Sequence, residues 1–215
     1  MRSFIVIGQR ATASPDFLLD DLPGTSGRLD VLLRTLRAAL LVSHGIRRDT
    51  TAYLVLLGGP RAPRALRVDG RIAEYLRPDE RSLATLVKKA LATATGAGTF
   101  TDVGHGLSVA GGGLDAVIAD LGESTRYVLD ESAADVRVGP LDTRNPAFFV
   151  GDHLGFDEGT RARLASIGAR PISIGPVSVH ADDAVTIISN EVDRRAQHPE
   201  TTENLTGREG GKEVD

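Results

Sequence analysis

Cysteine and tryptophan are absent from this chain of 215 residues, and there is only one methionine. Without cysteine the chain can form neither a disulfide bond nor a thiolate metal site. Its five histidines never fall at a spacing such as His-x-x-x-His, which would place two metal ligands on one helix face. We therefore expect no metal in the functional site.

Long apolar runs and an excess of positive charge are also missing. No stretch approaches the roughly 20 apolar residues that a membrane-spanning helix needs, and the N-terminus has the pattern of a strand rather than of a secretion signal. We expect a cytoplasmic protein with no membrane partner. The net charge of −4 argues against general electrostatic binding of nucleic acid, so any RNA binding must come from a local patch.

Apolar periodicity predicts strands alternating with helices. Strands are predicted at Ser3–Ile7, Tyr53–Leu57, Leu107–Ala110 and Tyr127–Leu129. Helices are predicted at Leu29–Ser43, from Asp79 or Ser82 to about Thr93, at Leu114–Leu121, and from Asp157 to near Gly168. This alternation predicts an α/β fold with a mainly parallel sheet. We expect one domain, residues 1–195, because a chain of this size can bury one core and has no obvious place to divide.

Two regions without apolar periodicity are predicted to lack regular structure. The segment after the first strand, up to about Gly27, is rich in proline, glycine and acidic residues and predicts a long loop. Loops of this length in a compact domain are often functional. The tail from about Ala196 lacks apolar anchors, and we expect it to be disordered.

Two local turns are predicted from glycine. Gly45 is expected to close the helix at 29–43 in a left-handed conformation, which would place His44 at the negative end of that helix. Arg67–Arg71 is expected to be the middle of a hairpin that a short strand at Ala73–Leu76 completes.

Two apolar runs in the last third of the chain lead into glycine. One is Phe148-Phe149-Val150-Gly151, and the other starts at Pro171 and reaches Gly175 before a segment, Ala181–Ile188, that predicts a helix. Glycine at the carboxyl end of a parallel strand lets the backbone approach a ligand closely. The pattern indicates a small-molecule pocket, although a glycine that merely starts a turn explains it equally well.

These runs, with Tyr127-Val128-Leu129-Asp130 before them, resemble the C-terminal half of the SPOUT methyltransferases. Blocks in the N-terminal half narrow the resemblance to the archaeal TrmY family; they are Arg2–Val6, Asp21–Asp30, Ser43–Asp49, Tyr53–Gly58 and Pro78–Ser82. The resemblance covers roughly residues 1 to 195 in unbroken order. It implies a SPOUT-type, mostly parallel sheet flanked by helices, with a C-terminal trefoil knot that topological rules alone would not predict.

The resemblance also implies a function. TrmY enzymes are homodimers that use S-adenosylmethionine to methylate N1 of pseudouridine at position 54 of the tRNA T-loop. Two alternatives stay open: the same chemistry on small-subunit rRNA, and an RNA-binding SPOUT protein that has lost catalysis. The acidic net charge and Ala184, where relatives commonly have cysteine, motivate the second alternative.

The resemblance assigns the cofactor to three segments. Leu129 and Val179 would clamp the adenine, while backbone groups near Gly151 and Gly175 would bind its edge and the ribose. The residues carried over in this way are Leu129, Gly151, Ile174, Gly175, Pro176, Val177, Ser178, Val179 and Ala184. Of these, Ala184 is expected to make at most a packing contact.

Catalysis is expected from a different segment. Methyl transfer from a sulfonium needs an in-line arrangement of nucleophile, methyl carbon and sulfur, and needs no metal. N1 of pseudouridine must also lose a proton, for which a carboxylate is the simplest acceptor. Asp21, Arg28 and Asp30 lie in a matching block, and we expect them to recognise the nucleoside and handle the proton. A turn cap, an exposed arginine and a helix-start carboxylate would explain the same residues without catalysis.

Arginines and histidines in loops complete the set of candidates. Arg47 and Arg48, and with less distinct support Arg81, are expected to contact the tRNA backbone, because guanidinium groups suit phosphate. Intramolecular pairing is the alternative for each. His153 and His180 lie beside the glycine turns, and we expect them to hold loops by hydrogen bonds rather than to transfer protons.

Overall fold

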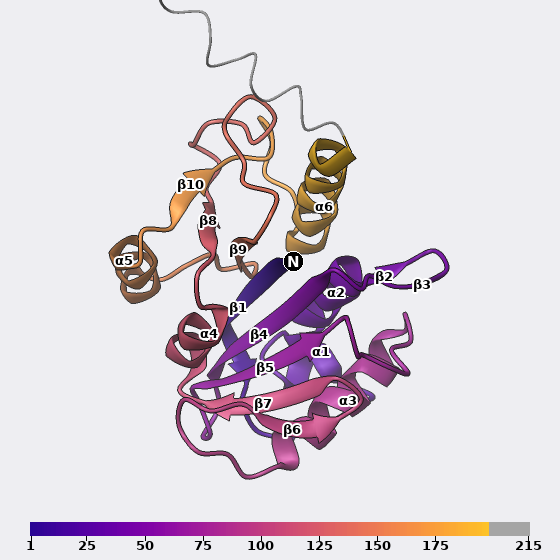
Figure 1. The fold of residues 1–215 in the computed structure, drawn as a ribbon. Helices are drawn as coiled ribbons and strands as arrows, with labels where there is room; N and C mark the ends of the chain where they lie inside the picture. The colour runs from indigo at the N-terminus through magenta and orange to yellow at the C-terminus, as the bar shows by residue number, and fades with distance from the viewer. Residues whose placement is uncertain (198–215) are drawn as a thin grey trace, which may run out of the picture.

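An eight-stranded sheet forms the centre of the computed structural model, which describes residues 1–197 (Figure 1). Five neighbouring strands are parallel, in the order β10 (Arg170–Ile172), β8 (Thr125–Leu129), β9 (Pro146–Gly151), β1 (Arg2–Thr12) and β4 (Thr50–Gly58). Three antiparallel strands extend the sheet beyond β4: β5 (Arg64–Asp69), β7 (Leu107–Gly111) and β6 (Thr101–Gly104). The predicted α/β class with a mostly parallel sheet is confirmed.

Helices cover both faces of the sheet. They are α1 (Leu22–Thr25), α2 (Leu29–Leu40), α3 (Glu80–Ala92), α4 (Gly113–Leu121), α5 (Glu158–Ser166) and α6 (Ala181–Gln197). Apolar residues of α1, α2, α3 and α6 join the core on one face, and those of α4 and α5 join the core on the other. A small two-stranded sheet, β2 (Leu41–Val42) and β3 (Gly45–Ile46), projects from the end of α2 (Figure 1).

The central strand β1 shows why this chain makes a two-faced core. Phe4 and Val6 belong to one apolar core, while Ile5 and Ile7 belong to the other, and all four are fully buried. A continuous apolar run is typical of a parallel strand with helices on both faces. Phe148 of β9 stacks on Phe4 with ring centroids 5.4 Å apart, an arrangement that contributes about 1 kcal/mol beyond area burial.

The helix starts predicted from capping residues are confirmed at two places. Asp79 caps α3 by accepting a hydrogen bond from the backbone nitrogen of Ser82 at 2.8 Å. Asp157 caps α5 in the same way, with the nitrogen of Thr160 at 2.7 Å. Each side chain satisfies an amide that the first helical turn leaves without a partner.

The predicted end of the first long helix is wrong. Helix α2 stops at Leu40, and the chain turns at once into the β2–β3 hairpin, where Gly45 pairs with Val42. Gly45 has a φ of +155° in this ladder and closes no helix. His44 is therefore exposed at the hairpin tip instead of lying at a helix end. The apolar residue Leu41 extends the helical pattern beyond the true helix.

The predicted hairpin around Arg67–Arg71 is also wrong. Strand β5 already starts at Arg64 and pairs antiparallel with β4, so the turn that joins them lies before Arg64. Ala73–Leu76 is not a strand, because Ala73 folds back and its nitrogen donates to the carbonyl of Asp69 at 2.8 Å. Buried Ala65 and Leu66 pack on opposite faces, which hides the alternation expected of a strand.

Three boundaries differ from the prediction by several residues. Strand β1 continues to Thr12, and the long loop after it contains the short helix α1. The apolar run from Pro171 forms a strand only as far as Ile172, and the rest is a loop. Helix α6 includes Ala196, where the tail was expected to begin, and the remainder of the predicted tail lies outside the described residues.

Candidate functional site

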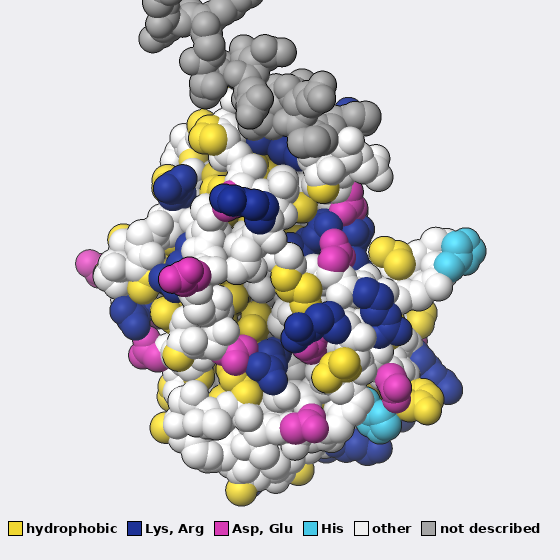
Figure 2. Space-filling view, in the orientation of Figure 1, with side chains coloured by type: hydrophobic (Ala, Val, Ile, Leu, Met, Phe, Trp, Pro, Cys, Tyr) yellow, Lys and Arg dark blue, Asp and Glu magenta, His cyan; other side chains and the backbone are white. Residues whose placement is uncertain are grey.

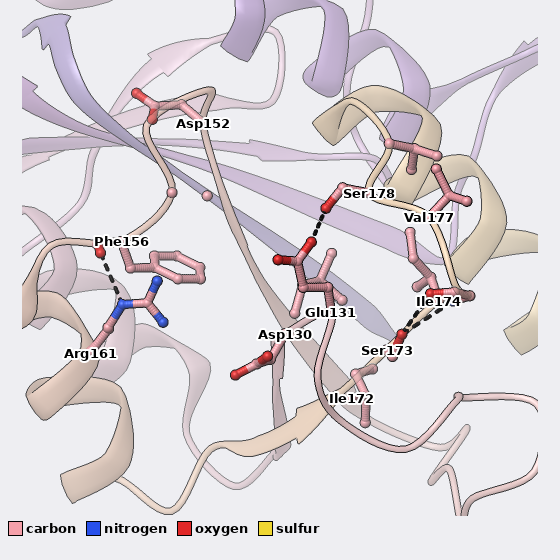
Figure 3. A pocket seen from close by; sticks show the side chains of 15 residues that line it. Asp130, Glu131, Asp152, Phe156, Arg161, Ile172, Ser173, Ile174, Val177 and Ser178 are labelled. Atoms are coloured by element: carbon pink, nitrogen blue, oxygen red, sulfur yellow. Dashed lines mark hydrogen bonds between the residues drawn. The ribbon is translucent and has the colours of Figure 1, made fainter.

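A cavity of about 300 Å³ opens where β8, β9 and β10 end (Figure 3). Because these strands are parallel, their carboxyl ends meet at one edge of the sheet, where ligands bind in open α/β sheets. The loops that follow the strands line the cavity with Leu129, Asp130, Glu131, Gly151, Asp152, Gly155, Phe156, Arg161, Ile172, Ser173, Ile174, Gly175, Val177, Ser178 and Val179. Its volume is at the lower end of the range for small-molecule sites.

The loop after β9 is built around a buried carboxylate. Asp152 is 7% exposed and accepts hydrogen bonds from the backbone nitrogens of Gln9 at 2.9 Å and Leu154 at 2.8 Å. Gly151 has no room for a side chain, because a Cβ there would lie 2.9 Å from the Cα of Gly155. The glycine at this strand end therefore permits a close approach of the chain to itself.

The loop after β10 turns at Gly175, which has a φ of +144°. The Ser173 hydroxyl stabilises this turn, donating to the carbonyl of Gly175 at 3.0 Å and accepting from its nitrogen at 3.3 Å. A Cβ at Gly175 would meet no heavy atom closer than the Arg137 guanidinium at 3.9 Å. Open space thus surrounds this cavity-lining glycine, in contrast to the crowded Gly151.

A side-chain contact joins the loops after β8 and β10 across the cavity. The Ser178 hydroxyl donates to the carboxylate of Glu131, as the dashed line in Figure 3 shows. Next to this contact, Val177 and Val179 are 69% and 42% exposed. Apolar side chains left open beside a polar bridge are typical of a site that a partly apolar ligand fills.

Acidic groups predominate around the cavity. Hydrogen bonds from the hydroxyl and backbone nitrogen of Ser132 lower the pKa of Asp130, so this carboxylate is ionised at neutral pH. Asp152 and Glu131 add two further carboxylates to the lining. Arg161 is the basic residue of the lining, and its Nε donates to the Phe156 carbonyl at 3.0 Å (Figure 3). The surplus of carboxylates suits a ligand that has hydroxyl groups or a positive charge.

Most of the predicted cofactor residues come together in this cavity. Those in its lining are Leu129, Gly151, Ile174, Gly175, Val177, Ser178 and Val179. Pro176 and Ala184 are not among the lining residues. Ala184 is 3% exposed and lies in the first half of α6, which is consistent with the packing contact expected of it.

The residues predicted for catalysis lie elsewhere in the chain. Asp21 is exposed and caps α1, accepting from the nitrogen of Gly24 at 3.1 Å. Arg28 has a left-handed φ of +69° and directly precedes α2, and Asp30 is the second residue of that helix. None of these three residues lines the cavity of its own chain.

The buried carboxylate of Asp30 forms an ion cluster with two partly exposed arginines. Its carboxylate is 3% exposed and accepts from Arg28 Nε at 2.9 Å, Arg28 Nη2 at 3.0 Å and Arg34 Nη1 at 3.1 Å. Burial raises the pKa of Asp30, but the hydrogen bonds and charges of Arg28 and Arg34 outweigh it, so the pKa lies below its ordinary value. A carboxylate in this state is a weak proton acceptor and a strong anchor for Arg28.

The three arginines predicted to bind RNA all make intramolecular contacts. Arg47 forms an ion pair with Asp193 of α6 at 2.9 Å. Arg48 donates to the carbonyls of Gly70 at 2.9 Å, Arg71 at 3.3 Å and Ala73 at 3.0 Å.

Arg81 forms an ion pair with Asp20 at 2.7 Å, and both side chains are largely exposed. An exposed pair of this kind contributes little to stability, because water and salt screen it. The Arg81 guanidinium can therefore exchange Asp20 for a phosphate at small cost.

The two histidines beside the glycine turns contribute little through their side chains. His153 Nδ1 lies 4.0 Å from the carboxylate of Asp152, which itself makes the hydrogen bonds that fix the loop. His180 acts through its backbone, since its carbonyl accepts from the nitrogen of Ala184 at 2.9 Å at the start of α6. His180 thus makes a helix-start hydrogen bond through its own backbone, whereas beside His153 the neighbouring Asp152 accepts the hydrogen bonds that hold the loop.

Residues 1–197 contain neither a candidate metal site nor a candidate membrane-spanning helix. No three histidine, aspartate or glutamate side chains in this part of the chain are grouped so as to hold a metal ion. No helix there combines the length and apolar character needed to cross a membrane.

Residues 1–197 match the sequence profile of a family described as "Putative SAM-dependent RNA methyltransferase". The chain belongs to this family. Among its relatives, proteins named tRNA (pseudouridine(54)-N(1))-methyltransferase are 39% identical in Methanosarcina acetivorans, 43% in Methanospirillum hungatei and 38% in Halobacterium salinarum. These matches cover 90 to 91% of this chain and 92 to 97% of the relatives.

A solved structure supports the fold independently. The crystal structure of Archaeoglobus fulgidus Nep1 bound to S-adenosylhomocysteine superposes with a TM-score of 0.63 at 15% sequence identity. The superposition covers 92% of this chain and 99% of that chain. At this identity the likeness establishes a shared fold for this family member.

Sequence reasoning missed about half of the cavity lining. The missed residues are Asp130, Glu131, Asp152, Gly155, Phe156, Arg161, Ile172 and Ser173. A signal was available for Asp130 and Asp152, which are acidic residues placed directly after a predicted strand end. Arg161 gave no such signal, because it lies on α5 and reaches the cavity only through the fold.

Proposed function

We infer that the protein uses S-adenosylmethionine to methylate N1 of pseudouridine 54 in the T-loop of tRNA. The observation that carries this inference is the cavity at the carboxyl ends of β8, β9 and β10, formed by the same loops that the family resemblance assigns to the cofactor. Relatives 38 to 43% identical over nine-tenths of the chain are named for this reaction.

The lining residues fit the cofactor. We propose that Leu129 and Val179 pack against the adenine and that backbone groups beside Gly151 and Gly175 bind its edge and the ribose, since all four residues line the cavity. The ionised Asp130 is a suitable acceptor for ribose hydroxyls. When bound, S-adenosylmethionine supplies a methyl group on a positively charged sulfur. The carboxylates of the lining favour that charge.

We propose different roles for the three catalytic candidates. In the reaction a bond forms between N1 and the methyl carbon, the carbon–sulfur bond breaks, and the N1 proton leaves. Asp21 is exposed and is the better proton acceptor, because the ion cluster already neutralises Asp30. Asp30 then serves to hold Arg28, whose guanidinium offsets negative charge on the carbonyl groups of the base.

We further propose a homodimer in which these residues act on the cofactor site of the partner subunit. The proposal follows from the absence of Asp21, Arg28 and Asp30 from the lining of their own cavity. Helices α2 and α6 are the expected surface, and a groove of about 540 Å³ lies between them. We also propose that residues 1–195 form one SPOUT domain with a C-terminal trefoil knot. We propose a cytoplasmic location for the protein.

Complementation between two inactive variants tests the shared site. Gly175→Leu should block the cofactor site and Arg28→Ala should block base recognition, so each alone should lack turnover. In a dimer with shared sites, mixing and reassociating the two variants should restore up to about a quarter of wild-type turnover. A mixed sample that stays inactive although mixed dimers form would contradict the shared site.

We propose that the tRNA backbone is contacted by Arg47, Arg48 and Arg81. Arg81 is accessible, since its own side chain is 67% exposed and that of its partner Asp20 is 83% exposed. Each phosphate contact should contribute to the salt dependence of tRNA binding. Arg81→Ala should therefore reduce the slope of log affinity against log salt by about one unit, whereas an unchanged slope would remove Arg81 from the set.

The substrate class is tested by offering purified tRNA and small-subunit rRNA to the same enzyme. Methylation of tRNA supports the inference. Methylation of rRNA alone would replace it with the rRNA alternative, and cofactor binding without transfer to either would favour the non-catalytic one.

A further inference from the structure

We propose that Tyr75 and His105 form a stacking platform for an unpaired nucleobase of the substrate RNA, apart from the methyl-transfer cavity. The two rings lie in a perpendicular arrangement with centroids 5.1 Å apart. Tyr75 lies in the loop between β5 and α3, and His105 in the turn between β6 and β7. The proposal rests on the proposed function, since it requires an RNA substrate.

The exposure of Tyr75 is exceptional in this chain. Aromatic residues make up only 4% of the sequence. Within residues 1–197 the other tyrosines and five of the six phenylalanines are buried, and Phe100 is half-buried. Tyr75 alone is widely exposed, at 71%. An aromatic ring in water loses the burial that normally stabilises it, and such a residue is typical of a binding surface.

Both residues have a backbone conformation that bulky side chains rarely adopt. Tyr75 has a φ of +56° and His105 a φ of +54°, in the left-handed region that favours glycine. Outliers of this kind persist only where the surrounding structure fixes them, and they cluster at functional sites. Because these two residues also contact each other, we infer that the surrounding fold holds both rings in this position.

The surrounding backbone fixes the two turns to each other. The nitrogen of Glu74 donates to the carbonyl of His105 at 3.3 Å, and the nitrogen of Asp69 donates to that of Gly106 at 2.9 Å. A Cβ on Gly106 would lie 2.6 Å from the Cα of the buried Ala73, so the turns touch through their backbones. The platform is therefore held in place before any ligand binds.

Arg48 strengthens this support. Its guanidinium donates to three carbonyls, those of Gly70, Arg71 and Ala73, all in the segment that leads to Tyr75. We therefore assign Arg48 a positioning role for the platform in addition to any contact with phosphate.

Charges around the platform suit RNA rather than an apolar partner. Arg71 is 66% exposed while paired with Asp69, and Arg77 is exposed two residues beyond Tyr75. The carboxylate of Glu74 lies 3.7 Å from His105 Nδ1. In Figure 2, apolar, basic, acidic and histidine side chains lie together on the lower right of this face, below the projecting hairpin. Exposed rings with nearby guanidinium groups match the way proteins bind unpaired bases, by stacking and phosphate contact.

Substitution at Tyr75 tests the platform. Tyr75→Asn removes the ring and suits the left-handed backbone, whereas Tyr75→Phe keeps a stacking surface. Leu18→Ala is the matched control, because Leu18 is an apolar side chain 62% exposed outside the two turns. We expect Tyr75→Asn to weaken binding of full-length tRNA roughly tenfold or more and to raise KM with kcat and S-adenosylmethionine affinity retained. Tyr75→Phe and Leu18→Ala should stay within about twofold of wild type.

Two results would overturn the platform. One is tRNA binding by Tyr75→Asn within about twofold of wild type, and the other is an equal loss in Tyr75→Phe, which would point to the hydroxyl rather than to stacking. Wild-type enzyme crosslinked to tRNA containing photoreactive 4-thiouridine gives a second measurement without any variant. A crosslink to the peptide containing Tyr75 supports the proposal, and crosslinks confined to other peptides contradict it. Absence of methylation by the wild type would instead contradict the proposed function.

Discussion

Gly175 is a residue through which the cofactor cavity can be closed without a steric clash, although its φ of +144° strains any side chain placed there. Its Cβ position is open, so a side chain there meets the cavity region rather than packed protein. We expect Gly175→Leu to weaken S-adenosylmethionine binding at least tenfold in calorimetric titration, with a fall in turnover.

Gly168→Leu is the control for this substitution. Gly168 also has a positive φ, +71°, and open space around its Cβ, but it does not line the cavity. Backbone strain should lower the stability of both variants, while only Gly175→Leu should lose cofactor affinity. Undiminished affinity in Gly175→Leu would contradict the assigned cavity.

Asp30 should stabilise the fold in a pH-dependent manner. Its pKa in the folded protein lies below the ordinary value of 3.8. Its contribution to stability is therefore present above about pH 4 and is lost as pH falls through the lower, folded pKa. Asp30→Asn should lower the free energy of unfolding by about 1 to 3 kcal/mol at pH 7, and by less at pH 3.

Urea unfolding of Asp30→Asn and wild type at pH 7 and pH 3 measures this difference. Asp21→Asn is the matched control, because Asp21 is exposed and has only a capping hydrogen bond to lose. On our assignment Asp21→Asn should lose turnover and keep most of its stability. Near wild-type turnover in both variants would show that neither carboxylate is the base.

The position of a single residue in the site could be predicted where it follows from the order of strands and loops along the chain. It could not be predicted where it depends on an unusual backbone conformation. Leu129 and Val179 could be placed in the cavity because they follow strand patterns that resemble a known family. Tyr75 and His105 could not be found, since nothing in their sequence neighbourhood encodes a positive φ at a non-glycine residue. Arg48 shows a third case, in which an arginine expected at a phosphate supports a neighbouring loop.

At the scale of elements, an ion network joins the first strand to the last helix. Arg2 of β1 is 5% exposed and pairs with Asp49 and Asp193, each at 2.6 Å. Asp193 of α6 also pairs with Arg47. Removing one partner from a buried charge is costly because the remaining charge stays without full compensation.

We therefore expect Asp193→Ala to lower the free energy of unfolding by roughly 2 to 3 kcal/mol, somewhat less than for a fully buried pair because Asp193 is partly exposed and Asp49 remains. Arg194→Ala, an exposed neighbour on the same helix, should change it by less than about 0.5 kcal/mol. Chemical denaturation of the two variants measures the difference. Equal stability of Asp193→Ala and wild type would show that the network does not secure α6.

Elements with explicit start signals were predicted well, and elements defined by their neighbours were not. Asp79 and Asp157 mark the starts of α3 and α5, because a capping side chain acts locally. Strand β5 escaped prediction because pairing with β4 and β7, rather than its own alternation, makes it a strand. The prediction that Gly45 closes a helix was wrong for the same reason, because pairing with Val42 in the hairpin sets its backbone conformation.

At the scale of the whole molecule, cofactor binding should stabilise the fold. At 100 times its dissociation constant, a ligand that binds only the folded state adds about 2.7 kcal/mol. For a chain of this size we expect S-adenosylmethionine to raise the Tm by roughly 5 to 10 °C. Thermal unfolding with and without cofactor measures the shift. No shift at a saturating concentration would favour an RNA-binding protein that has lost the cofactor.

The overall arrangement could be predicted because the apolar runs of the sequence are clear. Buried runs such as Phe4–Ile7 and Phe148–Val150 require helices on both faces, which leads to a parallel sheet and a site at the carboxyl ends of its strands. The proposed homodimer, in which one subunit completes the site of the other, could not be predicted from these runs. The positions of Asp21 and Arg28 outside their own cavity motivate it only once the fold is known.

Target chemistry is tested most directly with two T-loop RNAs, identical except for uridine or pseudouridine at the target position. Each is incubated with the purified protein and S-adenosylmethionine labelled in the methyl group. We expect label only in the pseudouridine RNA, because its N1 carries a free N–H, whereas N1 of uridine is bonded to the ribose and offers no equivalent nucleophile. Equal labelling of both RNAs, or no labelling of either despite cofactor binding, would contradict N1 methylation of pseudouridine.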